Sequence, residues 1–450
     1  MQDPMNDTIA APITGNGNTA VGVIRISGKQ SHEIAQKCFS KSLKGAKGYS
    51  LHYGHFLEGD NILDEVILAL FKAPKSFTGE NVVEISFHGS AFILAKAMEI
   101  LGQHGARPAE PGEFTMRAYL NGQMDLSQAE AVADLISSQS SAAHKMAMYQ
   151  LKGGYSEMIG DLKKRLIKFA ALLELELDFA EEDVEFADRE EFQKLIHEII
   201  QVCTQLVDSF RQGNAIKNGI PVAIVGPPNA GKSTLLNRLL KENRAIVSEI
   251  AGTTRDTIED EMVIAGHRFR FIDTAGIRET ADEIEKLGIQ RSLDSVRKAR
   301  IVLWVHDLSR GVEAFSEAAI RKELAIDAKL IQLANKLDAH HSDTIDSRLL
   351  PISAKTGEGM EELEKELGDY AASLHADGSD MIVSNQRHVR ALKDCIEHLN
   401  TASAGLKSGL STDLVAFDLR RAMESLGAIT GEITTDDLLG TIFSEFCIGK

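Results

Sequence analysis

The clearest chemical signal in the sequence is a glycine-rich loop of the kind that binds phosphate. Residues 226–233 read GPPNAGKS and fit the pattern G-x-x-x-x-G-K-[ST] without a mismatch. Such glycines let backbone N–H groups turn toward a phosphate, and the N-terminus of the following helix adds positive potential. We expect Lys232 to reach the β- and γ-phosphates and the Ser233 hydroxyl to bind Mg²⁺. The apolar IPVAIV before the loop and the helical TLLNRLL after it are the setting that this motif requires.

Two later motifs indicate which base the nucleotide carries. NKLD at 335–338 follows the apolar run LIQLA, and SAK at 353–355 follows RLLPI. Asp338 can accept hydrogen bonds from the two guanine N–H positions that adenine lacks, and a site built for such bonds penalises the analogue without them. Asn335 and Lys336 are expected to brace the loop, and SAK to offer backbone contacts to the guanine oxygen. This order of motifs predicts GTP rather than ATP.

Between these motifs lie two stretches that suit the switch loops of a GTPase. DTAG at 273–276 follows the apolar FRFI, so Asp273 is expected in the Mg²⁺ shell and Gly276 beside the γ-phosphate. GTTRD at 252–256 lies where a switch loop belongs, and Thr254 is expected to be the second Mg²⁺ ligand.

Two positions depart from a Ras-like catalytic site. Ile277 occupies the place just after the DxxG glycine, where many GTPases have a glutamine that orients water. An aliphatic side chain cannot polarise water, so another group must do so. Asn229, inside the phosphate loop, could coordinate a monovalent cation that neutralises transition-state charge, or could simply brace the loop. The acidic candidates for the water-orienting role, among which spacing alone does not choose, are Glu279, Asp282, Glu283 and Glu285.

The chain divides into zones that differ in their pattern of expected strands and helices, and these elements must position the residues named above. Residues 1–121 mix short apolar strands with glycine turns and one helical segment, which predicts an α+β domain. Residues 122–215 and 381–450 are helical, and neither zone looks self-sufficient, so together they predict one discontinuous all-helical domain. Residues 216–380 alternate strands and helices, which predicts an inserted α/β P-loop domain. The chain is therefore expected to be multidomain.

Composition limits the remaining possibilities. The 450 residues are 43% hydrophobic and 26% charged, as in globular proteins, and no run suggests a membrane span or a secretory signal. The four cysteines are far apart and show no zinc spacing, which favours a reduced, cytoplasmic protein. The net charge of -17 argues against a broad nucleic-acid footprint, so a nucleic-acid partner would need a local basic patch or a basic partner protein.

The motifs together resemble a known group of GTPases. GPPNAGKST, GTTRD, DTAGIRET, NKLD and SAK are similar to the TrmE–Era–EngA group, which has an apolar residue in place of the glutamine. Three further stretches resemble only the MnmE (TrmE) family of tRNA modification GTPases: 7–28, 111–136 and the terminal CIGK. The resemblance covers essentially the whole chain in order.

The resemblance implies a K⁺-stimulated GTP hydrolase. Members have an N-terminal domain that binds 5,10-methylene- or 5-formyl-tetrahydrofolate and dimerises, so a homodimer is expected. With the FAD-dependent partner MnmG, in a heterotetramer or larger complex, they modify C5 of the wobble uridine in tRNA with an aminomethyl or carboxymethylaminomethyl group. The alternative is a ribosome-assembly GTPase of the Era/EngA type, which would not need the folate-like stretches or the CIGK end. Asp338 speaks against an ATPase.

The resemblance also implies roles for individual G-domain residues. Ser233 and Thr254 would hold Mg²⁺, and Glu285 would orient the attacking water. K⁺ would be held by Asn229, Ser248, Ile250 and Thr253. The GTP-contacting set carried over from the family is Asn229, Ala230, Gly231, Lys232, Ser233, Thr234, Ser248, Glu249, Ile250, Ala251, Gly252, Thr253, Thr254, Asp273, Thr274, Ala275, Gly276, Asn335, Lys336, Asp338, Ser353, Ala354 and Lys355.

Five residues outside the G domain complete the implied sites. Arg25 can pair with a folate carboxylate or ring acceptor, and Glu84 can accept from pterin N–H groups. Gln123 stands where family members commonly have Lys or Arg, so ionic pairing with a carboxylate is lost at that position. Lys450 ends the tail that the family places at the folate pocket. Cys447 is the position implicated in the modification, as a nucleophile or as a small structural residue.

Overall fold

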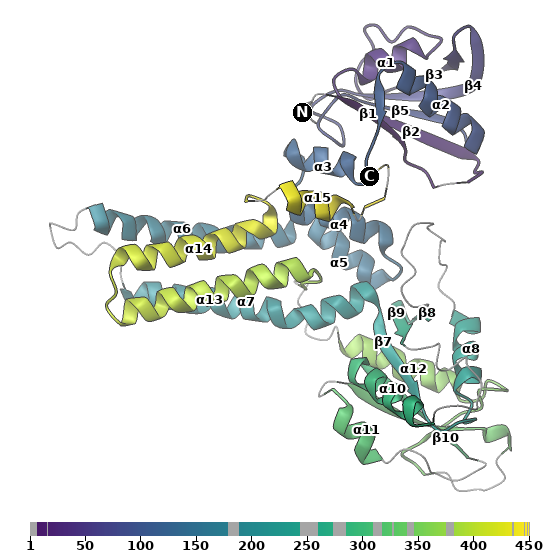
Figure 1. Ribbon diagram of the computed structural model, residues 1–450, viewed down its shortest axis with the longest axis vertical. Helices are drawn as coiled ribbons and strands as arrows, with labels where there is room; N and C mark the ends of the chain where they lie inside the picture. Colours follow the sequence, from purple (N-terminus) through teal and green to yellow (C-terminus); the bar gives the residue numbers. More distant parts are fainter. Residues whose placement is uncertain are drawn as a thin grey trace. The chain divides into compact units, whose positions relative to one another are not determined.

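The computed structural model places helices and strands along most of the chain (Figure 1). The described residues are 7–15, 17–178, 189–243, 260–272, 285–308, 317–325, 328–339, 346–374, 382–433, 436–444, 446–447 and 449. The chain divides into two compact units, each assembled from separated segments. The first unit is Met1–Ala133, Gln150–Asp178 and Leu419–Lys450, and the second is Asp134–Tyr149 and Phe179–Asp418.

The elements follow one another in two stretches. Before residue 179 they are β1 (Thr8–Pro12), β2 (Val21–Ser27), α1 (Ser31–Lys37), β3 (Ser50–Glu58), β4 (Asn61–Phe71), β5 (Val82–His88), α2 (Ala91–Gln103), β6 (Ala106–Pro108), α3 (Glu113–Leu120), α4 (Leu126–Ser137), α5 (Ser141–Leu151) and α6 (Gly154–Asp178). From residue 189 they are α7 (Arg189–Asn218), β7 (Ile220–Val225), α8 (Lys232–Asn243), β8 (Asp260–Ile264), β9 (His267–Phe271), α10 (Glu285–Lys298), β10 (Ile301–Asp307), α11 (Glu317–Glu323), β11 (Lys329–Asn335), the 3-10 turn η2 (Leu337–Ala339), β12 (Leu350–Pro351), α12 (Met360–Ser373), α13 (Gln386–Lys407), α14 (Thr412–Thr430) and α15 (Asp436–Ser444).

The N-terminal sheet has the strand order β3-β4-β5-β2-β1-β6, with β6 parallel to β1 and the other neighbours antiparallel. Buried and exposed side chains alternate along β4, so the strand has one buried and one exposed face. Val66, Leu68 and Leu70 are buried, while Glu65 and Ile67 are exposed. The buried face packs against α1 and α2 in one hydrophobic cluster. The expected α+β N-terminal domain is confirmed.

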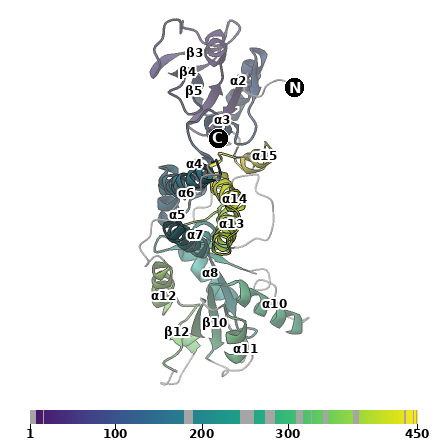
Figure 2. The same ribbon diagram turned by 90° about the vertical axis from the view of Figure 1, so that its left-hand side faces the viewer.

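Helices from distant parts of the sequence pack together within the second unit. In Figures 1 and 2, α13 lies beside α7, with the whole α/β domain between them in the sequence. The buried thiols of Cys203 on α7 and Cys395 on α13 are hydrogen-bonded to each other in this interface. Helical segments before and after the α/β domain therefore pack against one another, as the expected discontinuous helical domain requires.

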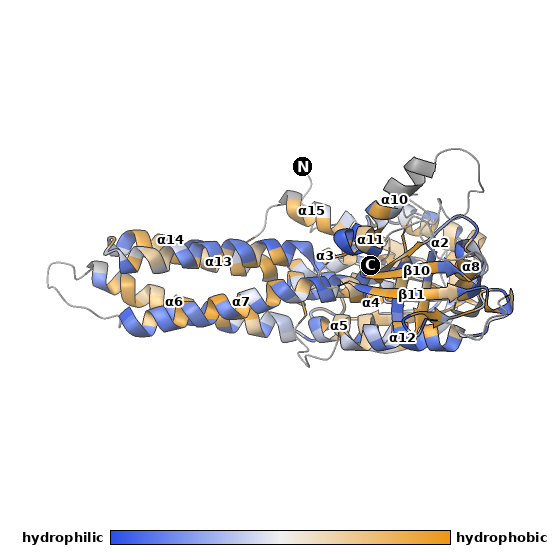
Figure 3. Cartoon of the chain, turned by 90° about the horizontal axis from the view of Figure 1, so that it is seen from below, coloured by the Kyte–Doolittle hydropathy of each residue, from blue (hydrophilic) through white to orange (hydrophobic). Residues whose placement is uncertain are grey.

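The second unit also contains a sheet of the type expected for a P-loop domain. Its order is β12-β11-β10-β7-β9-β8, parallel except where β8 pairs with β9. Every residue of β10 is buried, and Figure 3 shows β10 and β11 as hydrophobic strands. Residues of α8 and α12 cover one face, and residues of α10 and α11 cover the other. The inserted α/β domain is confirmed, and the exact boundaries expected for the domains remain predictions.

Candidate functional site

The phosphate loop lies between the buried strand β7 and helix α8. Three of its residues have positive φ angles: Gly226 at 152°, Asn229 at 63° and Gly231 at 94°. Lys232 begins α8, and its Nζ donates to the carbonyl oxygens of Gly226, at 2.9 Å, and of Pro227, at 2.8 Å. Burial lowers the pKa of the Lys232 ammonium. The loop therefore wraps a partly desolvated cation at a helix N-terminus, the arrangement that suits a polyphosphate.

Asn335 joins the phosphate loop to the SAK loop. It ends β11 and is almost completely buried, and its Nδ2 donates to the Ala230 carbonyl at 2.7 Å while its Oδ1 accepts from the Ala354 N–H at 3.0 Å. A Cβ at Gly231 would lie 2.2 Å from the Asn335 Nδ2, so only glycine fits at that position. One amide therefore fixes the distance between the loops expected to hold the phosphates and the base.

The carboxylate expected to read the base, Asp338, contacts the SAK loop. Asp338 lies in η2, its Oδ1 accepts from the Ser353 hydroxyl at 2.7 Å, and its side chain is 23% exposed. Lys336 has a φ of 71° and donates from Nζ to Asp307 at 2.6 Å, which anchors the start of the NKLD turn on the end of β10. Asp338 thus keeps acceptor capacity toward an open side, as a guanine site needs.

Several expected site residues lie outside the described residues. Asn229 and Ser233 are described: Asn229 lies in the phosphate loop, and Ser233 lies in the first turn of α8. Glu285 begins α10, but the structure does not describe its side chain. Outside the described residues lie Ser248, Glu249, Ile250, Ala251, Gly252, Thr253, Thr254, Asp273, Thr274, Ala275, Gly276, the three other acidic candidates Glu279, Asp282 and Glu283, and the terminal Lys450.

In the first unit, Arg25 and Glu84 meet as partners on neighbouring strands. They face each other in the register between β2 and β5, and the Arg25 Nε and Nη2 both lie 2.8 Å from the Glu84 Oε1. The guanidinium also lies over two rings, 4.9 Å from the centre of Phe77 and 5.6 Å from that of Phe114. Sequence reasoning gave the two charged residues separate roles and missed both rings, because only strand register and tertiary packing bring them together.

Gln123 and the described residues of the tail contact other parts of the N-terminal domain. Gln123 is exposed, and a Cβ at Gly79 would lie 3.0 Å from its Nε2, which places it at the turn that follows Phe77. Cys447 is exposed, and its carbonyl accepts from the Gly112 N–H at 3.4 Å. Gly449 has a φ of 95°, and a Cβ there would lie 2.3 Å from the Pro12 carbonyl oxygen. The tail therefore runs against the end of β1.

Comparison with known proteins relates the whole chain to one family. A family model described as the MnmE helical domain matches residues 126–447, and one described as the GTP-binding protein TrmE N-terminus matches residues 8–123. The tRNA modification GTPase MnmE of Christiangramia forsetii is 48% identical over 99% of this chain and 100% of its own length. The chain belongs to the MnmE family. The MnmE protein of Porphyromonas gingivalis is 49% identical over 99% of this chain and 98% of its own length.

Two solved structures are similar to parts of the chain. A crystal structure of Era in complex with MgGDPNP and nucleotides 1506–1542 of 16S ribosomal RNA is 31% identical. That match covers 33% of this chain and 56% of Era, with a TM-score of 0.25. The FeoB G-domain from Methanococcus jannaschii is 21% identical over 34% of this chain and 97% of its own, also with a TM-score of 0.25.

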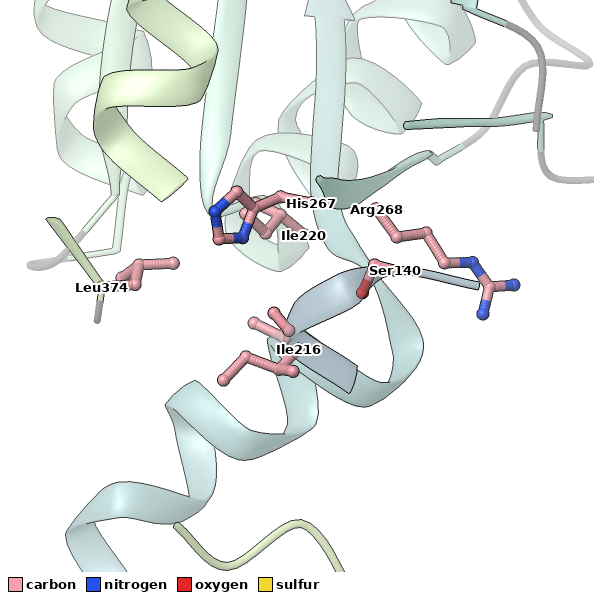
Figure 4. A pocket seen from close by; sticks show the side chains of 8 residues that line it. Ser140, Ile216, Ile220, His267, Arg268 and Leu374 are labelled. Carbon is pink, nitrogen blue, oxygen red and sulfur yellow. The ribbon is translucent and has the colours of Figure 1, made fainter. Parts of the chain in front are cut away.

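Membership in the MnmE family confirms the expected enzyme class, a GTP hydrolase, and the GTP-binding G domain. No described helix is long and apolar enough to cross a membrane. Among the described residues, no group of three or more His, Cys, Asp or Glu side chains is placed to hold a metal ion. A small hollow with an empty volume of about 230 Å³ lies where the end of α7 meets the starts of β7 and β9 (Figure 4), away from the phosphate loop at the other end of β7.

Proposed function

We propose that this chain is a K⁺-stimulated cytoplasmic GTPase that acts with an FAD-dependent MnmG-type protein on tRNA. The product is an aminomethyl or carboxymethylaminomethyl group on C5 of the wobble uridine. The observation that carries the proposal is that MnmE relatives match both units of the chain over 99% of its length, rather than the G domain alone. An assembly GTPase would need neither the Arg25–Glu84 site nor the tail.

The G domain supplies the GTP-binding half of the mechanism. Backbone N–H groups of the phosphate loop and Lys232 hold the β- and γ-phosphates, and Asp338 accepts from the guanine N–H groups. Ser233 together with Thr254 would hold Mg²⁺, which would neutralise charge that develops on the phosphates. Glu285 is proposed to orient the attacking water in place of the glutamine that Ile277 replaces. Binding and positioning are the protein's contributions, as in other phosphoryl-transfer sites.

Asn229 is proposed to contribute to a K⁺ site beside the phosphates. Its left-handed backbone, at a φ of 63°, presents the residue on the exposed side of the loop, and an amide oxygen is a neutral ligand suited to K⁺. The Ser248 and Ile250 carbonyls and Thr253 are the other proposed ligands. A monovalent cation held there would supply the positive charge that an arginine finger supplies in other GTPases.

The first unit is proposed to bind the folate that donates one carbon to the uridine. A reduced folate provides the carbon that joins C5 of uridine to the amine. Arg25 suits the folate carboxylates, Glu84 suits pterin N–H groups, and Gln123 and Lys450 contribute neutral and charged contacts. Phe77 and Phe114 give the site apolar walls that a flat ring system can use. Cys447 is proposed to act from the tail, where its carbonyl accepts from the Gly112 N–H, and a second copy of the chain is proposed to complete a homodimer.

The experiment that tests the proposal reconstitutes the reaction. Purified chain is incubated with an MnmG-type protein, an in-vitro tRNA transcript, GTP, 5,10-methylene-tetrahydrofolate and ammonium or glycine, in K⁺ or in Na⁺ buffer. Digestion and mass spectrometry should show modified uridine only with GTP, and faster GTP turnover in K⁺. Asn229→Gly, which tolerates the positive φ, should lose the K⁺ stimulation. GTP hydrolysis without any modified uridine in the complete mixture contradicts the proposed function, and equal turnover in Na⁺ and K⁺ contradicts the cation site.

A further inference from the structure

Positive charge is concentrated in one part of the N-terminal domain, although the chain as a whole carries a net charge of -17. Residues 34–57 and residues 66–79 contain no Asp or Glu. These two segments carry six lysines, all of them exposed, which together we call the lysine face: Lys37, Lys41, Lys44, Lys47, Lys72 and Lys75. The acids that border these segments are Glu33, Glu58, Asp60, Asp64, Glu65 and Glu80. Of these, Glu65 lies on β4 opposite His55 and accepts a hydrogen bond from the Tyr53 hydroxyl.

Hydrogen bonds and a close backbone approach join the two segments into one surface. The Tyr49 N–H donates to the Leu70 carbonyl at 2.7 Å, and the Tyr49 hydroxyl donates to the Lys75 carbonyl at 2.9 Å. A Cβ at Gly48 would lie 3.4 Å from the Lys72 Cβ, so the loop after α1 lies directly against the end of β4. Within the described residues, none of the six ammonium groups has an ion-pair partner.

Two exposed tyrosines lie among these lysines. Tyr53 on β3 is 57% exposed, and the Lys41 Nζ lies 5.4 Å from the centre of its ring. Tyr49 is 66% exposed and has a φ of 60°, a conformation that a bulky side chain rarely adopts. Its two hydrogen bonds and an edge-on ring contact with Phe71, at 5.6 Å, hold it there. A strained yet fixed and exposed aromatic side chain in this position suits ligand binding better than packing.

We propose that the lysine face, with Tyr49 and Tyr53, binds the phosphate backbone and exposed bases of tRNA. This inference rests on the proposed function, because that function supplies the tRNA. Unpaired ammonium groups without neighbouring acids in sequence bind polyphosphates through counterion release, and tyrosine rings stack on unpaired bases. A second copy of the chain is the less suitable occupant, since a two-fold contact would bring the same six cations against one another.

The number of lysines that contact phosphates determines how strongly salt weakens tRNA binding. If Z lysines contact phosphates, the logarithm of the association constant falls with the logarithm of salt concentration with a slope of about −0.9 for each contact. Removing three contacts should therefore reduce the slope by about 2 to 3 and weaken binding at moderate salt by tenfold or more.

The test compares two triple variants of the full chain that change the net charge equally. The first, Lys44→Gln with Lys47→Gln and Lys75→Gln, alters the lysine face. The control, Lys322→Gln with Lys365→Gln and Lys407→Gln, alters exposed lysines of the second unit. Binding of a labelled tRNA transcript is measured by fluorescence anisotropy between 50 and about 300 mM KCl, the range over which counterion release dominates. The face variant should bind at least tenfold more weakly with a shallower salt slope, and the control should match the wild type.

Further measurements make each outcome decisive. GTP turnover and circular dichroism should be unchanged in both variants, because the lysine face lies outside the G domain and the control lysines are exposed and are not among the expected GTP contacts. Tyr53→Ala should weaken tRNA binding while Tyr53→Phe should not, since both aromatic rings stack.

Equal loss of tRNA binding in both triple variants, or no loss in the face variant, overturns the proposal while leaving the proposed function intact. A change in oligomeric state with unaltered tRNA binding would identify the face as an interface between copies, and wild-type protein that binds no tRNA would remove both this proposal and the proposed tRNA partner.

Discussion

Asp338 and Glu84 are both carboxylates expected to read N–H groups of a heterocycle, but their surroundings differ. Asp338 accepts from the neutral Ser353 hydroxyl, and its Oδ2 lies 4.0 Å from the Nζ of the exposed Lys355. Glu84 is already paired with Arg25. A ligand that uses both members of the Arg25–Glu84 pair must therefore replace a short charge-assisted hydrogen bond, whereas a guanine base at Asp338 meets only the longer contact with an exposed lysine. Different substitutions are needed to test the two residues.

Asp338→Asn should exchange base specificity. The asparagine Nδ2 donates where guanine also donates, so GTP affinity should fall about 100-fold, while xanthosine triphosphate gains a donor opposite its 2-oxo group. Equilibrium binding of fluorescent GTP and xanthosine triphosphate analogues measures the exchange. Asp346→Asn, an exposed aspartate paired with Arg348, is the matched control and should bind like the wild type. Unchanged GTP affinity in Asp338→Asn would show that this carboxylate does not contact the base.

Glu84→Gln should separate the two ends of a bound folate. Loss of the carboxylate weakens 5-formyl-tetrahydrofolate, because its pterin N–H groups lose a charged acceptor. The same change frees Arg25, so p-aminobenzoylglutamate, which has carboxylates but no pterin, should bind at least as tightly as to the wild type. Calorimetry with both ligands gives the comparison, with Glu65→Gln on the exposed part of β4 as the control. Equal weakening of both ligands would refute separate contacts for the pterin and the carboxylates.

Local patterns in the sequence predicted the elements that carry the phosphate loop, and pairing between distant segments was not predictable. The loop motif lies between β7 and α8 because an apolar run and a helical run flank it in the chain. The contact of Arg25 with Phe77 and Phe114, in contrast, depends on where the loop after β4 and the helix α3 return to the sheet. Residue spacing within one segment does not indicate where this loop and helix contact the sheet, because tertiary packing determines those contacts.

Asn335→Ala should uncouple two loops of the G domain. It would leave the buried Ala230 carbonyl and Ala354 N–H without their amide partner, which should cost about 3 kcal/mol of G-domain stability. Trp304, the single tryptophan, lies buried on β10, so its fluorescence during urea unfolding reports on this domain. Asn400→Ala, at an exposed position on α13, should change stability by less than about 0.5 kcal/mol. If both variants unfold alike, the bridge contributes nothing.

Helix α3 is attached to β1 and β6 by an acid-sensitive network. Burial alone would raise the pKa of Glu113, but hydrogen bonds from Arg107, the Glu110 N–H and Arg117 outweigh it, so the pKa lies below its usual value. Similarly, burial would raise the pKa of Asp7, and Arg107 and Arg117 lower it on balance. Because these carboxyls titrate lower when folded, their stabilisation is present above the usual carboxyl pKa and is lost as pH falls through the lowered values.

Glu113→Gln should therefore reduce the stability of the N-terminal domain by about 2 kcal/mol at pH 7, and the difference should shrink toward zero in strong acid. Urea unfolding is followed by near-ultraviolet circular dichroism, to which this domain contributes Tyr49, Tyr53 and Tyr119, three of the six tyrosines. The fluorescence of Trp304, the single tryptophan, reports separately on the G domain. Glu33→Gln, at an exposed position on α1, should show the wild-type acid dependence. A constant difference between Glu113→Gln and the wild type at all pH values would assign the effect to packing rather than to charge.

The two compact units carry the two halves of the proposed chemistry. The phosphate loop, NKLD and SAK belong to the second unit, while Arg25, Glu84 and the described tail residues belong to the first. A substitution confined to one unit should therefore alter one ligand's binding and leave the other's unchanged. The tail offers the sharpest case, because its last described residue needs a backbone conformation that an added methyl group opposes.

Gly449→Ala should displace the tail and weaken 5-formyl-tetrahydrofolate binding at least tenfold, with GTP turnover unchanged. The new Cβ would meet the Pro12 carbonyl, and alanine is strained at a φ of 95°. Gly440→Ala in α15, where a Cβ has open space, is the control and should bind folate normally. A chain ending at Phe446 should lose as much affinity as Gly449→Ala. Folate binding that survives both changes would remove the tail from the site, whereas loss of GTP turnover in either variant would show that the two units do not act independently.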